Sequence, residues 1–196
     1  MIFSRKQNSE LERFADLLIK GTRELFAERG EGLSFTEEPK KERRQIMEWN
    51  GKMRADGMDK FDNESTYVSA VNFYANQADM SKNKTLGALV VYIQQEYLPK
   101  LMRTLKYPPI DDESEQAMLD SCGTLCNIIG GRFKSEISKN GYIELEWSHF
   151  YNYRNSAFDG VHFCFAEYTL YEVAFKIENA KRMVIEMTMG VVPKRA

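Results

Sequence analysis

The sequence lacks a long hydrophobic run and an excess of basic charge, and each absence excludes a class of partner. Its longest apolar stretch, Leu86 to Ile93, is far shorter than the roughly 20 residues that a membrane-spanning helix needs. The formal net charge is -2, so no overall positive field exists to attract nucleic acid or an anionic membrane surface. We therefore expect no nucleic-acid partner and no membrane partner.

Cysteine is also scarce. Three cysteines occur, Cys122, Cys126 and Cys164, at spacings that match no disulfide framework. Residues 1–10 become polar before the apolar region of a signal peptide could form. Together these observations predict a cytoplasmic protein.

Motifs of the common enzyme classes are missing. HExxH, CxxC and GxSxG do not occur, and Gly130-Gly131 lies late in a predicted helix, where it cannot form a phosphate-binding loop. Cys122 and Cys126 are one helical turn apart, which makes a metal site conceivable, but Cys122 belongs to an apolar stripe where a free cysteine packs as a small hydrophobe. We expect no metal and no cofactor, and ordinary packed or surface roles for His149 and His162.

Hydrophobic periodicity predicts an α+β domain with two layers, in which an antiparallel sheet carries long helices on one face. The length favours one domain over residues 1–196. Helices are expected from a capping box at Ser9 to about Glu31, and over Gln95–Leu105 and Glu115–Lys134. Strands are expected over Leu33–Thr36, Tyr67–Tyr74, Leu86–Ile93, Tyr142–Phe150, His162–Tyr168, Glu172–Ile177 and Arg182–Met189, with a turn at Asn179-Ala180 and a loop over Tyr151–Gly160.

Residues 36–66 differ from the rest of the chain because eight acidic and seven basic residues fall among 31. Mixed charge of this kind predicts a solvated insertion or loop. The basic cluster Lys40, Lys41, Arg43 and Arg44 is either a plain solvated surface or a docking site for an acidic partner. Interleaved acids favour the plain surface.

The predicted helix Glu115–Lys134 has an unusual outer face. One side carries an apolar stripe, and the other carries short side chains together with one amide, namely Asp120, Gly123, Thr124, Asn127 and Gly131. Glycine inside a helix costs roughly 1 kcal/mol relative to alanine, so a low surface that admits a partner closely is one explanation. The Asn127 amide has a donor and an acceptor, enough to orient a water for attack on a phosphoryl group held by another protein.

Asp120 to Gly131, DSCGTLCNIIGG, resembles the signature helix of the CheC/CheX chemotaxis phosphatase superfamily. The resemblance implies the CheC/CheX fold, a CheY-like receiver domain of a response regulator as partner, and removal of phosphate from its aspartyl-phosphate. It also implies that Asn127 orients the attacking water, that an acid contacts the receiver's lysine, and that Mg²⁺ is needed only in the partner receiver domain.

The resemblance places that acid at position 124, where this chain has Thr124. Asp120 lies one turn further back, about 6 Å along the helix axis. Three functions stay open: a CheX-like protein that binds a receiver without efficient hydrolysis, an active phosphatase using Asn127 with Asp120, or an interaction or structural protein unrelated to signalling. We also expect a homodimer formed through sheet edges of the last strands.

Overall fold

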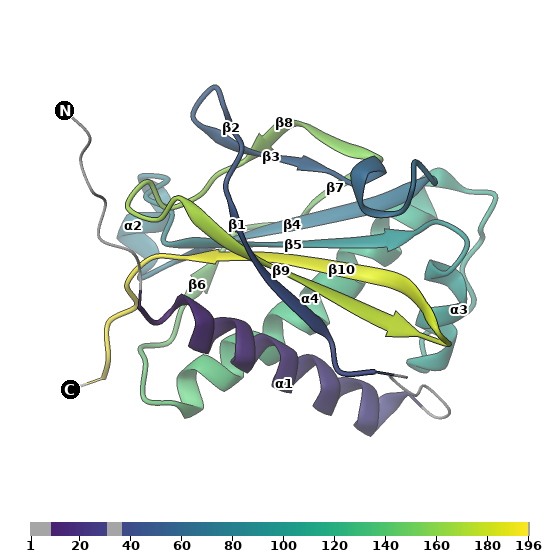
Figure 1. Ribbon diagram of the computed structural model, residues 1–196, viewed down its shortest axis with the longest axis horizontal. Helices are drawn as coiled ribbons and strands as arrows, with labels where there is room; N and C mark the ends of the chain where they lie inside the picture. Colours follow the sequence, from purple (N-terminus) through teal and green to yellow (C-terminus); the bar gives the residue numbers. More distant parts are fainter. Residues whose placement is uncertain (1–8, 31–36, 196) are drawn as a thin grey trace.

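A seven-stranded antiparallel sheet carries two long helices on one face (Figure 1). This computed structural model describes residues 9–30 and 37–195. The strand order is β1-β9-β10-β5-β4-β6, and β7 also pairs with β4. The strands are β1 (Lys40–Gln45), β4 (Thr66–Tyr74), β5 (Gly87–Gln94), β6 (Glu146–Trp147), β7 (Tyr151–Arg154), β9 (Thr169–Ile177) and β10 (Ala180–Met189). The predicted α+β class is confirmed, and the strand expected over Leu33–Thr36 lies outside the described residues.

Three helices cover one face of this sheet and enclose the main core, namely α1 (Leu11–Arg29), α3 (Leu98–Thr104) and α4 (Glu115–Lys139). The short helix α2 (Gln77–Ser81) buries no residue and lies beside β4 and β6. Residues such as Phe14 of α1 and Phe133 of α4 are fully buried against strand residues such as Phe73, as their helical periodicity predicted. Ser114 caps α4 by accepting a hydrogen bond from the Ala117 amide, whereas the N-cap of α1 is Glu10, so the predicted capping box at Ser9 is wrong.

Of the predicted insertion 36–66, the described residues 37–66 do not form a solvated loop, and this expectation is corrected. The segment supplies β1 at the edge of the main sheet, and its strands β2 (Glu48–Trp49) and β3 (Lys52–Asp56) join β8 (Ser156–Val161) in a second, three-stranded sheet. That sheet packs on the face of the main sheet opposite the helices (Figure 1), where Met53 and Tyr92 are fully buried in a second core. A few apolar residues alternating with charges are enough to order the segment.

The basic cluster of β1 is paired within the molecule. The ammonium of Lys41 contacts Asp16 at 2.6 Å and Glu12 at 3.2 Å, while Arg44 contacts Glu42 and Glu172. These intramolecular pairs use the charge that an acidic partner would need, so the plain surface interpretation fits the structure better.

Several strand predictions after α4 are wrong for identifiable reasons. Only Glu146–Trp147 of the strand expected over Tyr142–Phe150 pairs with β4, because Ile143 donates its amide to Pro193 near the C-terminus. The expected strand His162–Tyr168 is irregular, because its aromatic rings pack on one another: Phe163 lies 4.9 Å from Phe165 and 5.5 Å from Tyr168 between ring centroids. The expected loop over Tyr151–Gly160 instead contains β7 and β8.

The C-terminal hairpin is confirmed, with its turn one residue earlier than predicted. Glu178 and Asn179 both have left-handed φ angles, of 53° and 65°, and connect β9 to β10. Both strands lie inside the sheet, since β9 has β1 and β10 as neighbours and β10 has β9 and β5. The proposed basis for a homodimer, free edges of the last strands, is therefore wrong.

A buried charge cluster connects the second core to the main sheet. The ammonium of Lys60 contacts Glu172 of β9 at 2.6 Å and Glu186 of β10 at 2.5 Å, and the Tyr92 hydroxyl donates to Glu186 at 2.5 Å. Complete burial raises the pKa of Tyr92, and the charges of Glu186 and Glu172 and the hydrogen bond to Glu186 raise it further. The cluster fixes the segment around Lys60 over β9 and β10.

Candidate functional site on helix α4

Four of the sequence-predicted site residues form one stripe along α4. Positions 120, 124, 127 and 131 follow the three- and four-residue spacing of one helix face. Asp120 and Asn127 are exposed, and Thr124 and Gly131 are partly exposed. The opposite side of the helix, including Cys122, Leu125 and Ile129, is fully buried, as predicted.

Asn127 presents its amide to solvent. Among the described residues its side chain has no hydrogen-bond partner, so both the donor and the acceptor are free to contact another molecule. Helix α4 is rigid here because the residues around Asn127, such as Leu125 and Ile129, are anchored in the core. The structure therefore holds one free amide on a rigid, exposed helix.

Thr124 and Asp120 are arranged less favourably for contact with a cation. Thr124 has no charge, and its hydroxyl already donates a hydrogen bond to the backbone carbonyl of Asp120 at 2.9 Å. The Asp120 carboxylate accepts from Gln116 Nε2 at 2.9 Å, on the side away from Asn127. Seven residues separate Asp120 from Asn127, which is about 10 Å along the axis. The acid and the amide are thus further apart than one helical turn.

The glycines of α4 are explained by contacts within the molecule. Gly123 is buried beneath Asn152 of β7, and a Cβ at position 123 would lie 2.6 Å from the Asn152 amide nitrogen. Gly130 and Gly131 lie beside the indole of Trp147, whose ring atoms would be 3.6 Å from a Cβ at either position. Gly123 is therefore not on the exposed face, contrary to the sequence prediction, while Gly131 is.

The other flank of the stripe carries a feature that the sequence analysis missed. The connection between α3 and α4 borders a shallow hollow of about 280 Å³ that includes Tyr107, Pro108, Pro109 and Thr124. The Pro-Pro pair was visible in the sequence as a helix stop, but nothing in the pattern placed it beside Thr124. An aromatic ring and two prolines form a stiff apolar rim next to the motif.

The cysteines do not form a reactive or metal-binding centre with this stripe. Cys122 and Cys126 are fully buried, and burial raises the pKa of the Cys126 thiol to about 12, which keeps it protonated. Over residues 9–30 and 37–195, no group of three His, Cys, Asp or Glu side chains is placed to hold a metal ion.

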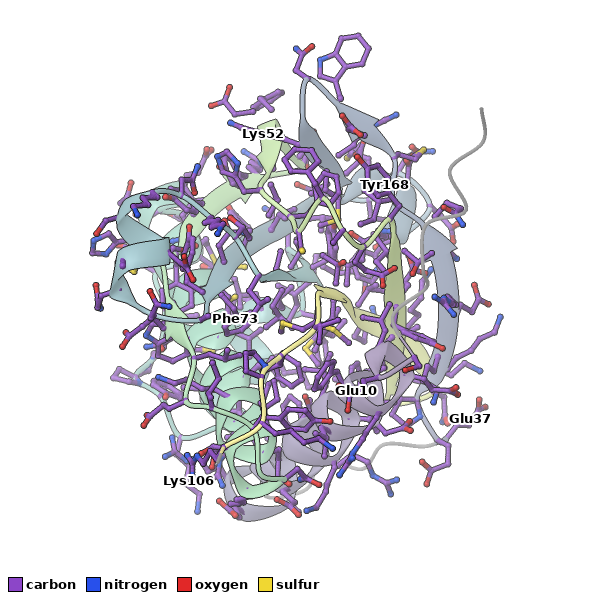
Figure 2. The ribbon with its side chains drawn as sticks, turned by 90° about the vertical axis from the view of Figure 1, so that its left-hand side faces the viewer. Glu10, Glu37, Lys52, Phe73, Lys106 and Tyr168 are labelled. Atoms are coloured by element: carbon purple, nitrogen blue, oxygen red, sulfur yellow. The ribbon has the colours of Figure 1, made fainter. Side chains whose placement is uncertain are left out.

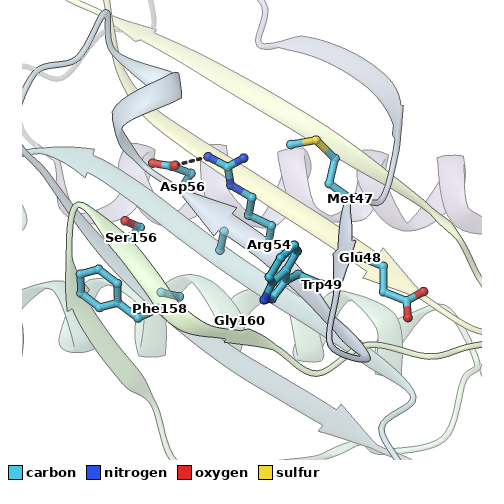
Figure 3. A pocket seen from close by; sticks show the side chains of 10 residues that line it. Met47, Glu48, Trp49, Arg54, Asp56, Ser156, Phe158 and Gly160 are labelled. Atoms are coloured by element: carbon cyan, nitrogen blue, oxygen red, sulfur yellow. Dashed lines mark hydrogen bonds and ion pairs between the residues drawn. The ribbon is translucent and has the colours of Figure 1, made fainter.

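A hollow of about 500 Å³ lies on the three-stranded sheet (Figure 3). Trp49 and Phe158 line it and are 73% and 86% exposed, and Arg54 pairs with Asp56 at 2.6 Å within it. The main sheet separates this hollow from α4. It cannot contribute to the Asn127 face.

No protein-family model matches the chain, and no curated protein matches it. Several solved structures do match the chain. Chemotaxis protein CheX from Vibrio vulnificus has 13% identity and a TM-score of 0.57, with 89% of this chain and 97% of that chain covered. A CheC-like superfamily protein from Shewanella sp. PV-4 has 16% identity and a TM-score of 0.51, with 92% and 97% covered. FliY from Thermotoga maritima has 12% identity and a TM-score of 0.51, with 96% and 91% covered.

At such low sequence identities, the similarity to these proteins shows a shared fold. The chain has the fold of CheX and CheC-like chemotaxis proteins over most of its length, as the residues of α4 predicted. Among the described helices, none is long and apolar enough to cross a membrane.

Proposed function

We propose that this is a CheX-like protein of chemotaxis or two-component signalling that binds the phosphorylated receiver domain of a CheY-like response regulator through the exposed stripe of α4. The observation that carries the proposal is the free amide of Asn127, held on a rigid helix at the position where the resemblance expects the water-orienting asparagine. The fold shared with CheX supports it.

Efficient phosphatase activity is not part of the main proposal, because the acid expected at position 124 is replaced by a threonine whose hydroxyl donates to the helix backbone. A carboxylate paired with a lysine across a desolvated interface aligns two proteins and contributes a few kcal/mol. Without that pair the receiver docks through neutral contacts and the apolar rim around Tyr107. The protein then binds its receiver without hydrolysing it quickly.

Binding is tested by measuring the affinity for beryllofluoride-activated receiver domains with the wild type and two variants. Thr124→Arg should abolish binding, because a long cation would meet the lysine that the resemblance places in the receiver. Thr104→Arg is the matched control, since Thr104 of α3 makes the same hydroxyl-to-backbone bond at 2.9 Å and does not line the hollow beside Thr124. Equal affinities for the two variants, or no receiver bound by the wild type, would refute the proposal.

The alternative, an active aspartyl-phosphate phosphatase using Asn127 with Asp120, is favoured by one observation: both side chains are exposed on the same stripe. It is tested by the rate of phosphate loss from phosphorylated receivers. Acceleration that disappears in Asn127→Ala and in Asp120→Asn supports it. Receiver binding without acceleration supports the main proposal instead.

A further inference from the structure

Another pocket, of about 250 Å³, lies where the main sheet meets the three-stranded sheet, on the face of the main sheet opposite α4. It is lined by Lys52 of β3, Asn72 of β4, Tyr151 and Tyr153 of β7, and residues 159–162 at the end of β8. Figure 2 shows Lys52 at the opposite end of the molecule from α1 and α4. Ala70 and Gly160 leave the space open, because neither has a side chain long enough to fill it.

The polar groups of this pocket are not used by one another. Lys52 and Asp159 both line it, yet no ion pair joins them within 4.0 Å. Among the described residues neither side chain forms any other hydrogen bond or ion pair. Asn72 is 2% exposed and donates its amide to the His162 carbonyl at 2.6 Å. Its amide oxygen has no hydrogen-bond partner in the described part of the chain. An unpaired amide oxygen and two separated opposite charges remain available to a ligand.

His162 is held in one tautomer by its neighbours. The Tyr74 hydroxyl donates to Asn83 Oδ1 at 3.1 Å, so the Asn83 amide nitrogen, 3.2 Å from His162 Nε2, donates to the ring. The ring proton is therefore on Nδ1. Burial and the charge of Lys52 lower the pKa of His162, so the ring is neutral at pH 7. The side of the pocket near Lys52 thus provides one cation and one neutral donor.

The remaining lining groups favour a cation. Tyr151 and Tyr153 project from the same side of β7, two residues apart, and aromatic faces attract ammonium groups. The charge of Asp159 acts on Tyr153, whose pKa is raised by burial and by that carboxylate. Asn72 adds an acceptor. The pocket therefore contains both donor groups and acceptor groups within a volume that fits a few heavy atoms.

We propose that this pocket binds a small zwitterion of the amino-acid type, whose carboxylate contacts Lys52 and His162 and whose ammonium contacts Asn72, Asp159 and the tyrosine rings. A simple anion would leave Asp159 and Asn72 without partners, and a simple cation would leave Lys52 without one. The site is independent of the receiver-binding stripe, because it lies on the other face of the main sheet.

The test is calorimetric titration of the full chain with each of the common amino acids, and with acetate and ethylamine as single-charge probes at ~10 mM. At least one amino acid should bind, and neither single-charge probe should match it. Lys52→Met and Asp159→Asn should each weaken binding by about tenfold or more. The matched exposed controls Lys181→Met and Asp112→Asn should bind as the wild type does.

Three results would overturn the proposal. They are the absence of binding for every amino acid, an equal affinity for acetate, and an unchanged affinity in Asp159→Asn. Circular dichroism of each variant establishes that it is folded, so that loss of binding reports on the pocket.

Discussion

Asn152 of β7 lies over Gly123 of α4 so closely that a Cβ at position 123 would come within 2.6 Å of the Asn152 amide nitrogen. The Asn152 side chain cannot easily move aside, because its Oδ1 accepts a hydrogen bond from Ser69 at 2.7 Å. This contact joins the helix of the candidate site to the edge of the sheet. It explains why a glycine, Gly123, occurs in the middle of α4.

Gly123→Ala should therefore destabilise the protein by about 1–3 kcal/mol, because the added methyl overpacks the contact with Asn152. Gly131→Ala is the matched control, since its Cβ would meet Trp147 at an ordinary 3.6 Å, and helix propensity should stabilise it by about 0.5–1 kcal/mol. Urea unfolding measures both. Similar changes for the two variants would mean that the Asn152 contact is not tight in solution.

Thr124→Glu should raise phosphatase activity toward a bound receiver by at least about tenfold, because it restores an acid one turn before Asn127. The double variant Thr124→Glu/Asn127→Ala should lose that gain, and Thr104→Glu should have no effect. Phosphate release from a phosphorylated receiver is the measurement. A receiver that binds equally well but is hydrolysed no faster would show that more than the acid is missing.

Lys60→Met should destabilise the fold by about 3–5 kcal/mol, because Glu186 would remain buried without a cation, beside Glu172, which keeps only Arg44. Lys20→Met is the comparison. Its ammonium contacts Glu136 at 2.7 Å but is largely exposed, and Glu136 keeps Lys139, so the cost should stay below about 1 kcal/mol. Chemical denaturation at pH 7 should separate the two variants clearly, and equal losses would contradict this account of the cluster.

Stability should fall as the pH rises from about 10 to about 12, in part because of Tyr97. Burial raises the pKa of Tyr97 from 10.0 to about 12. In that window the unfolded chain loses the phenol proton while the folded protein keeps it, so increasing pH favours unfolding. Tyr97→Phe should have a shallower decline than the wild type. Urea midpoints at several pH values provide the comparison.

The sequence was sufficient to predict the helices and strands that have a clear local hydrophobic pattern. The buried stripe of α4, the neighbouring antiparallel strands β4 and β5, and the C-terminal hairpin all follow from periodicity and turn residues. The face of α4 was predicted less completely, because the contacts of Gly123 and Gly131 come from Asn152 and Trp147, more than 15 residues away. Periodicity carries no information about which distant strand crosses a helix.

The loop prediction for the charged segment was wrong for a different reason. Its charge density favoured a loop, but Met53 and Ala55 bury themselves between the two sheets, and Lys60 finds two carboxylates on strands more than 100 residues later. The composition reflects the many solvent-facing side chains of this segment, and it does not reveal the few side chains that are buried. The pocket beside His162 was unpredictable for the same reason, since four separate segments form it.

Strand β1 has a further consequence for the behaviour of the protein at high concentration. It is the outermost strand on its side of the main sheet and carries four cationic side chains among its six residues. An unpaired strand edge is a template for open-ended addition of other chains, and charged side chains on it oppose such growth. We therefore expect the charged side chains of β1, including their intramolecular ion pairs, to oppose the addition of further strands at this edge.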